Sequence, residues 1–360
     1  MTRKRKRCSK KPTPFIKKKS KTSLAGVNQQ KYPLRRYEPY HEKFLTYSQI
    51  RDFLVRLQKS CPNIMQVSTI GLSTKGRPIY MAVISEGDST SKPKSGTMIV
   101  AGANGTEWFT VSSALYMIEQ LVKGRNLVKI MDYFIIPCSN PDAYECSLEN
   151  KGKEINAMDL SRNFPFSLGI YDLSGISNEV FFKAIREWKE NYRFDCPERL
   201  AVIKAVLSYQ VAIKLFISLE GDGTKITYPF GFCNIEISDV EDLKKVAKAG
   251  KSGIKCRCFA VGSMYNLDGM RFGSMVDYIK MCQGSIKFTY TIHVNEKEKN
   301  LNPCKILCYG QDVMNCVRFM AKNIYMLYDK TEINSCDDFF AFIVICIWRY
   351  MVFIKYLFKI

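Results

Sequence analysis

Histidine is nearly absent from this chain, whose 360 residues include only His41 and His293. A zinc site built on two or three histidines would have to use both, although they stand 252 positions apart. Acidic residues are absent from the first 37 positions, which carry 14 lysines and arginines. The remaining positions hold 40 basic and 34 acidic residues, so the net charge of +20 belongs mainly to the amino-terminal segment. This distribution disfavours a nucleic-acid-binding surface spread over the whole fold.

The amino terminus also lacks the apolar run of a secretory signal, because no stretch of seven or more apolar residues follows the basic residues 1–7. On this ground we expect a cytoplasmic or nuclear location and free thiols for the 14 scattered cysteines. Hydrophobic residues make up 46% of the chain, which is enough for a sizeable core and excludes a wholly disordered chain.

Composition divides the chain into three segments. Residues 1–36 are predicted to be a disordered basic arm, which is either a solvated tail or an arm for nuclear localisation and for binding polyanions or nucleic acid. Residues 37–329 are predicted to form one domain. Residues 330–360 form a hydrophobic tail, in which ten apolar residues (339–348) are followed by Arg349 and Lys355. These two charges disfavour a transmembrane helix, which leaves two interpretations of residues 339–360: membrane contact in the interface, or packing against the domain.

Hydrophobic periodicity predicts alternating helices and strands in the central segment. The first helix is centred on Ile50–Leu57, with Thr46 or Ser48 as its N-cap. Further helices are predicted at about 109–122, 178–191, 198–208, 239–249 and 311–328, and strands at 65–70, 79–85, 97–101, 132–136, 213–219 and 286–294. This alternation is typical of an α/β sheet with helices on both faces.

Five short blocks then follow one another along the domain, at residues 71–79, 101–108, 137–144, 159–164 and 228–231. Their residues are GLSTKGRPI, AGANGTEW, PCSNPDAY, DLSRNF and YPFG. In this order the blocks resemble the zinc metallocarboxypeptidases of the carboxypeptidase A/B type, over about residues 37–329. The resemblance implies a doubly wound α/β fold with a mixed, mostly parallel eight-stranded sheet. It also implies a site at the carboxyl ends of the strands, where such sheets bind ligands. Members of this family are usually secreted, in contrast to the location expected above.

The resemblance locates the family's zinc ligands, a His-x-x-Glu pair and a distant histidine, at Asn104, Glu107 and Glu220. Only Glu107 keeps the family residue, so the resemblance implies a degenerate zinc site. We expect no bound cofactor, with zinc present only if the family chemistry survives. The spacing of Asn104 and Glu107 favours a capping box at a helix start over metal binding.

The family's general base is a glutamate in a Phe-Thr-x-Glu strand, and residues 288–291 read Phe-Thr-Tyr-Thr. The base position is therefore Thr291, and Asp277, of an Asp-aromatic pair, stands 14 residues before it, as in the family. A threonine hydroxyl cannot accept a proton from water near neutral pH, so no catalytic residue is expected to be intact.

Parts of the family's pocket for a peptide's terminal carboxylate survive. Ser161 and Arg162 match its Asn-Arg pair, Tyr265 matches its mobile tyrosine, and Val276 is an apolar residue at the position that sets side-chain preference. We expect weak binding of a peptide or protein C-terminus, led by Arg162. The alternative is a structural arginine paired with Glu107 or Glu220.

Three functions compete on this basis. The leading hypothesis is a catalytically inactive carboxypeptidase that works by binding. The second is an active enzyme with an altered metal site, in which Asn104, Glu107 and Glu220 hold Ca²⁺, Mg²⁺ or Mn²⁺. The third is a nuclear or polyanion-binding protein that acts through its basic arm. The sequence His293-Val294-Asn295-Glu296 also spells His-x-x-Glu, but it lies beyond the base position and is interpreted as chance.

Overall fold

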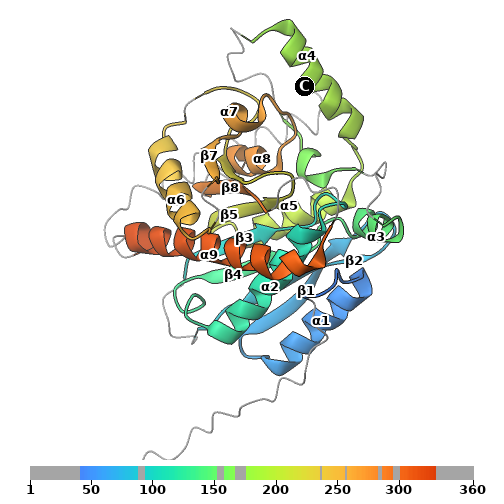
Figure 1. The fold of residues 1–360 in the computed structure, drawn as a ribbon, viewed down its shortest axis with the longest axis vertical. Helices are drawn as coiled ribbons and strands as arrows, with labels where there is room; N and C mark the ends of the chain where they lie inside the picture. Colours follow the sequence, from blue (N-terminus) through green and yellow to red (C-terminus); the bar gives the residue numbers. More distant parts are fainter. Residues whose placement is uncertain are drawn as a thin grey trace, which may run out of the picture. The chain divides into compact units, whose positions relative to one another are not determined.

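The computed structural model describes residues 41–87, 94–151, 158–166, 176–235, 237–255, 258–282, 286–294 and 301–329 (Figure 1). The predicted basic arm (1–36) and hydrophobic tail (330–360) lie outside the described residues. In the described part of the chain, no helix is long and apolar enough to cross a membrane. None of the cysteines described there is paired in a disulfide.

Eight strands form one mixed sheet in the order β1-β2-β4-β3-β5-β8-β6-β7. They are β1 (Met65–Leu72), β2 (Pro78–Ile84), β3 (Gly96–Val100), β4 (Asp132–Ile136), β5 (Ile213–Glu220), β6 (Lys225–Tyr228), β7 (Ala260–Ser263) and β8 (Phe288–His293). The four central strands, β4, β3, β5 and β8, run parallel. Antiparallel pairing joins β2 to β4 on one side and β6 to β8 on the other. The sheet confirms the predicted α/β fold.

Helices cover both faces of the sheet (Figure 1). On one face, α1 (Tyr47–Ser60), α2 (Trp108–Gly124), α6 (Val240–Ser252) and α9 (Ile306–Ile324) enclose the larger core. On the other face, α5 (Pro197–Tyr209) and α8 (Met275–Cys282) enclose a second core. Neighbouring residues of β3 show why there are two: Ile99 belongs to the first core, whereas Met98 and Val100 belong to the second. Successive side chains of a strand point to opposite faces, so a strand buried on both faces is apolar throughout.

Local sequence signals explain most of the boundaries. Thr46 caps α1 in a capping box with Gln49, and Asn140 caps α3 (Pro141–Glu149) with a proline in its first turn. The predicted bounds of β4 and α4 (Asn178–Asn191) match the structure. The last helix begins at Ile306, earlier than predicted. The prediction did not include α3, β6, β7, α7 (Met264–Asp268) or α8, all of which are short.

Candidate functional site

The site lies where the central parallel strands end. Asn104 follows β3, Glu220 is the last residue of β5, and Thr291 lies near the end of β8. Because these strands run in the same direction, their carboxyl ends share one edge of the sheet. The structure therefore brings these three sequence-predicted positions to the same edge.

Asn104 is engaged within its own loop. Its Oδ1 accepts hydrogen bonds from the backbone N–H of Thr106 at 3.1 Å and from the Thr106 hydroxyl at 2.9 Å. Glu107 occupies the N-cap position of α2, and its side chain makes no capping hydrogen bond. The predicted capping box is therefore wrong. Thr106 offers Asn104 two donors only two residues away, so the asparagine closes a local turn.

Glu107 and Glu220 lie close to each other and to other carboxylates. Burial, reinforced by Asp159 and Glu220, raises the pKa of Glu107 well above its usual range, and its Oε2 is buried without a hydrogen-bond partner. Burial and Asp159 also raise the pKa of Glu220 to about 7, against the opposing effects of Arg271 and of the Ser218 hydroxyl. That hydroxyl donates to Glu220 Oε1 at 3.2 Å. Both carboxyl groups therefore hold a proton to higher pH than an ordinary glutamate.

The side chains at the family's zinc positions do not fit a zinc ion. They supply one amide and two carboxylates, whereas the family's pattern needs two imidazole nitrogens. The amide oxygen of Asn104 is already engaged by Thr106. Across the described ranges, no group of three or more His, Cys, Asp or Glu side chains is arranged to hold a metal ion.

Thr291, at the base position, lies in the interior of the sheet. It pairs with Ser218 of β5 and with Thr227 of β6, and none of its surface is exposed. Its Oγ1 is buried and has no hydrogen-bond partner. A fully buried hydroxyl of this kind has neither the basicity nor the solvent access to activate water.

Arg162 ends a short 3₁₀ helix, η1 (Leu160–Arg162), and keeps part of its side chain at the surface. Its Nη2 lies 3.4 Å from Glu187 Oε2, on α4, and 27% of the side chain is exposed. Arg162 forms its ion pair with Glu187, so the alternative that paired it with Glu107 or Glu220 is wrong. Ser161 is buried and donates its hydroxyl to Asp159 Oδ1 at 2.8 Å.

Tyr265 and Val276 differ in what they offer to a ligand. Tyr265 lies on α7, where its N–H donates to the Phe230 carbonyl at 3.0 Å and its half-buried ring packs near Phe230 and Phe272. Val276, on α8, is fully buried in the second core. In this arrangement Val276 contributes packing and presents no surface.

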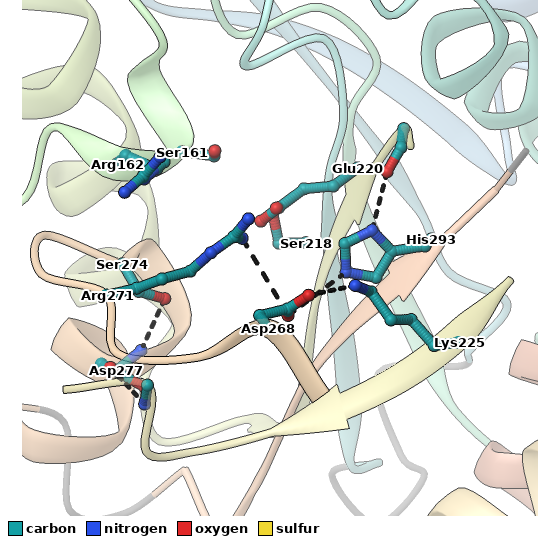
Figure 2. Close-up of polar contacts among 12 residues, drawn as sticks. Ser161, Arg162, Ser218, Glu220, Lys225, Asp268, Arg271, Ser274, Asp277 and His293 are labelled. Atoms are coloured by element: carbon teal, nitrogen blue, oxygen red, sulfur yellow. Dashed lines mark hydrogen bonds and ion pairs between the residues drawn. The ribbon is translucent and has the colours of Figure 1, made fainter. Parts of the chain in front are cut away.

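A charged cluster that the sequence analysis missed lies beside these positions (Figure 2). Asp268 is almost fully buried, and its Oδ1 contacts the ammonium group of Lys225. Its Oδ2 lies 4.0 Å from Arg271 Nη1 and 4.0 Å from His293 Nε2. Asp268 therefore joins the end of α7 to the first residue of β6 and the last residue of β8.

His293 belongs to this cluster, although its motif was interpreted as chance. Its ring Nδ1 lies 2.7 Å from the Gly221 carbonyl, and because a carbonyl can only accept, Nδ1 carries the proton. Burial, with the cations Lys225 and Arg271, lowers the pKa of His293 to about 4. His293 pairs with Glu220 in the parallel ladder and follows Thr291 by two positions on β8. Residues two positions apart in a strand point to the same face, so the sequence alone indicated that His293 and Thr291 share a face of β8.

Asp277, of the Asp-aromatic pair, connects α8 to the last of the five sequence blocks. Its Oδ2 accepts from the backbone N–H of Gly231 at 2.9 Å, which joins α8 to the Tyr-Pro-Phe-Gly segment. Burial raises the pKa of Asp277 to about 7, against two backbone hydrogen bonds.

Comparison with known proteins agrees with this architecture. The zinc carboxypeptidase family, Peptidase M14, matches residues 50–316. Mouse carboxypeptidase A1 is 25% identical over 279 residues, which cover 71% of this chain and 60% of that protein. The chain thus spans about 60% of the length of this relative. Bovine carboxypeptidase O is 22% identical over 326 residues, covering 84% of this chain and 82% of that protein.

Solved structures show the same fold. The crystal structure of thrombin-activatable fibrinolysis inhibitor superposes with a TM-score of 0.69 at 20% identity, covering 81% of this chain and 77% of that one. Carboxypeptidase A from Helicoverpa armigera gives a TM-score of 0.67 at 21% identity, covering 80% and 75%. The family match spans well over half of the chain, so this protein belongs to the zinc carboxypeptidase family, peptidase M14.

Proposed function

We propose that this protein is a catalytically inactive member of the family that binds a peptide or protein through its C-terminal carboxylate. The observation that carries the proposal is the combined replacement at one edge of the sheet. Asn104 and Glu220 stand at the two histidine positions, and buried Thr291 stands at the base position. Metal, activated water and base act as a unit in such chemistry, so losing all of them together removes catalysis.

The surviving contact for a ligand is Arg162. Its guanidinium is partly exposed, and its ion pair with Glu187 at 3.4 Å is long for a charge-assisted hydrogen bond. Glu187 is itself 43% exposed, so water screens this pair and an incoming carboxylate can compete with it. A guanidinium presents a planar fork that matches a carboxylate, and it stays charged at any relevant pH.

Affinity is limited by the acids nearby. Asp159 and Glu220 raise the pKa of Glu107, and Asp159 raises that of Glu220, so these carboxyl groups lie close together, and any of them that is ionised opposes an incoming anion. We therefore expect a dissociation constant no better than roughly millimolar, which corresponds to about −4 kcal/mol.

The test compares one peptide as its free acid and as its C-terminal amide, titrated against the full chain. The free acid is expected to bind more tightly, to lose that advantage with Arg162→Gln, and to remain intact by mass spectrometry. Equal binding of acid and amide would falsify the proposal, as would cleavage by the purified protein.

A further inference from the structure

We propose that Arg271 forms, together with Arg162, a two-guanidinium subsite that selects ligands whose C-terminal residue is itself acidic. The inference rests on the proposed function and adds the chemical class of the ligand. Arg162 takes the α-carboxylate, and Arg271 takes the carboxylate of the last side chain.

The Arg271 guanidinium has N–H donors that are not used in hydrogen bonds to the side chains of described residues. Its side chain is 29% exposed, and within ion-pair distance it meets one carboxylate among the described residues, Asp268, at 4.0 Å. That separation is too long for a hydrogen bond. The other oxygen of Asp268 contacts Lys225, so Lys225 already compensates the charge of Asp268. In the described part of the chain the Arg271 guanidinium donates no side-chain hydrogen bond, so its N–H donors can reach an anion, although Glu220 lies near enough for Arg271 to lower its pKa.

The backbones that carry the two arginines are packed against each other at Gly273. Phe164, two residues after Arg162, donates its N–H to the Gly273 carbonyl at 3.0 Å. A Cβ placed at Gly273 would lie 2.4 Å from the carbonyl oxygen of Arg162, and Gly273 has a φ of +77°. Glycine alone permits this close approach.

Arg271 itself is held in place from both ends. Its N–H donates to the Gly231 carbonyl at 2.8 Å, and its guanidinium lies beside buried Asp268. Figure 2 shows the Arg271 side chain extended toward Ser218 and Glu220, with Arg162 on a neighbouring segment of the site. The subsite is thus fixed by the fold before a ligand arrives, which lowers the entropic cost of binding.

The surroundings of this subsite favour an acidic side chain over an apolar one. Val276 is fully buried, so it offers no apolar wall to the last residue of a ligand. A ligand with two carboxylates can therefore satisfy two guanidinium forks, whereas a neutral side chain leaves one of them without a partner.

The experiment uses the full chain and four peptides of one sequence. They end in Glu or in Gln, each as the free acid and as the C-terminal amide, and their dissociation constants are measured by calorimetry. The Glu-ending free acid is expected to bind at least about tenfold more tightly than the Gln-ending free acid. Arg271→Gln should reduce that ratio to about one while keeping the preference for acid over amide.

Two further variants serve as controls. Arg125→Gln removes one positive charge near the carboxyl end of α2, the opposite end from Glu107, and should leave all ratios unchanged. Arg271→Lys keeps the charge but loses the fork, so it should give an intermediate ratio. It also provides a second variant if Arg271→Gln unfolds, which thermal melting of each variant reveals.

The outcomes separate the two proposals. If acid binds better than amide but Glu and Gln are equal, the acidic subsite is wrong and the proposed function stands. If the Glu preference persists in Arg271→Gln, another group provides it and the subsite is again wrong. If acid and amide bind equally, both proposals fail together.

Discussion

The side-chain oxygen of Asn104 accepts two hydrogen bonds from Thr106, at 3.1 Å from the backbone N–H and 2.9 Å from the hydroxyl. Asn104, at the position predicted to match the family's first zinc ligand, therefore forms its side-chain hydrogen bonds within its own loop. Burial and neighbouring carboxylates raise the pKa of the other two positions, Glu107 and Glu220, so each holds a proton to higher pH than an ordinary glutamate.

The first prediction concerns zinc. Elemental analysis of the purified chain should find far less than one zinc per molecule, because neither histidine ligand is present. The double variant Asn104→His with Glu220→His should gain about one zinc, since it rebuilds a His₂Glu set with Glu107. Neither Asn104→His alone nor Glu220→His alone should gain stoichiometric zinc. Stoichiometric zinc in the unmodified chain, lost with Glu107→Gln, would contradict this account.

The second prediction concerns stability and pH at Glu220. Its folded pKa of about 7 lies above the usual glutamate value, so the folded state binds more protons than the unfolded state between about pH 4.5 and 7. Stability should therefore fall as pH rises through this window. Glu220→Gln keeps the shape and removes the charge, so it should raise the free energy of unfolding at pH 8 by about 2 kcal/mol.

Denaturant titrations at pH 4.5 and pH 8 check this prediction. At pH 4.5 the variant and the parent should differ little, because Glu220 is protonated in the folded state and about half protonated in the unfolded state. A loss of stability at pH 8 would show that the charged carboxylate has a partner that stabilises it.

The third prediction concerns the ion pair between Lys225 and Asp268. Asp268→Asn leaves Lys225 without its partner in a largely buried position, and it should lower the free energy of unfolding by roughly 3 kcal/mol. The double variant Lys225→Met with Asp268→Asn should recover much of the loss, since it removes the uncompensated charge. Arg51→Gln breaks an exposed pair with Asp52 and provides the control, with a change under about 1 kcal/mol. Additive effects of the two substitutions would argue against coupling between Lys225 and Asp268.

The fourth prediction concerns residues 1–36, which hold all 14 of the basic residues counted above and no acidic residue. We propose that this arm binds polyanions, with an affinity that falls steeply as salt increases because counterions are released. Binding to heparin or DNA should therefore disappear when residues 1–36 are deleted. Binding that is unaffected by the deletion, or that is flat from low to high salt, would leave the arm as a solvated tail.

Periodicity and family motifs were sufficient for the architecture of the domain. The bounds of β4 and α4 matched, because Asp132–Ile136 is a short apolar run that ends at a proline and Asn178–Asn191 alternates apolar and charged residues with a helical period. The short elements β6, β7, α7 and α8 were missed, since four to eight residues carry too little periodicity. Their positions depend on tertiary contacts such as that between Asp277 and Gly231.

The site was predicted less completely, for a physical reason. Motifs locate positions along the chain, but ion-pair partners are chosen by distance in space. Glu187 therefore replaced Glu107 and Glu220 as the partner of Arg162, and Thr106 took the hydrogen bonds of Asn104. The Asp268 cluster joins residues from three separate elements, so no local sequence pattern could predict it.

The measurement that tests the central claim most directly is turnover of peptides with a free C-terminus by the purified full chain, with zinc added and contaminating peptidase excluded. The account predicts no turnover, and none after the single substitutions Asn104→His, Glu220→His or Thr291→Glu, with activity requiring all three together. Hydrolysis by the unmodified chain that is abolished by a chelator and by Glu107→Gln would contradict it.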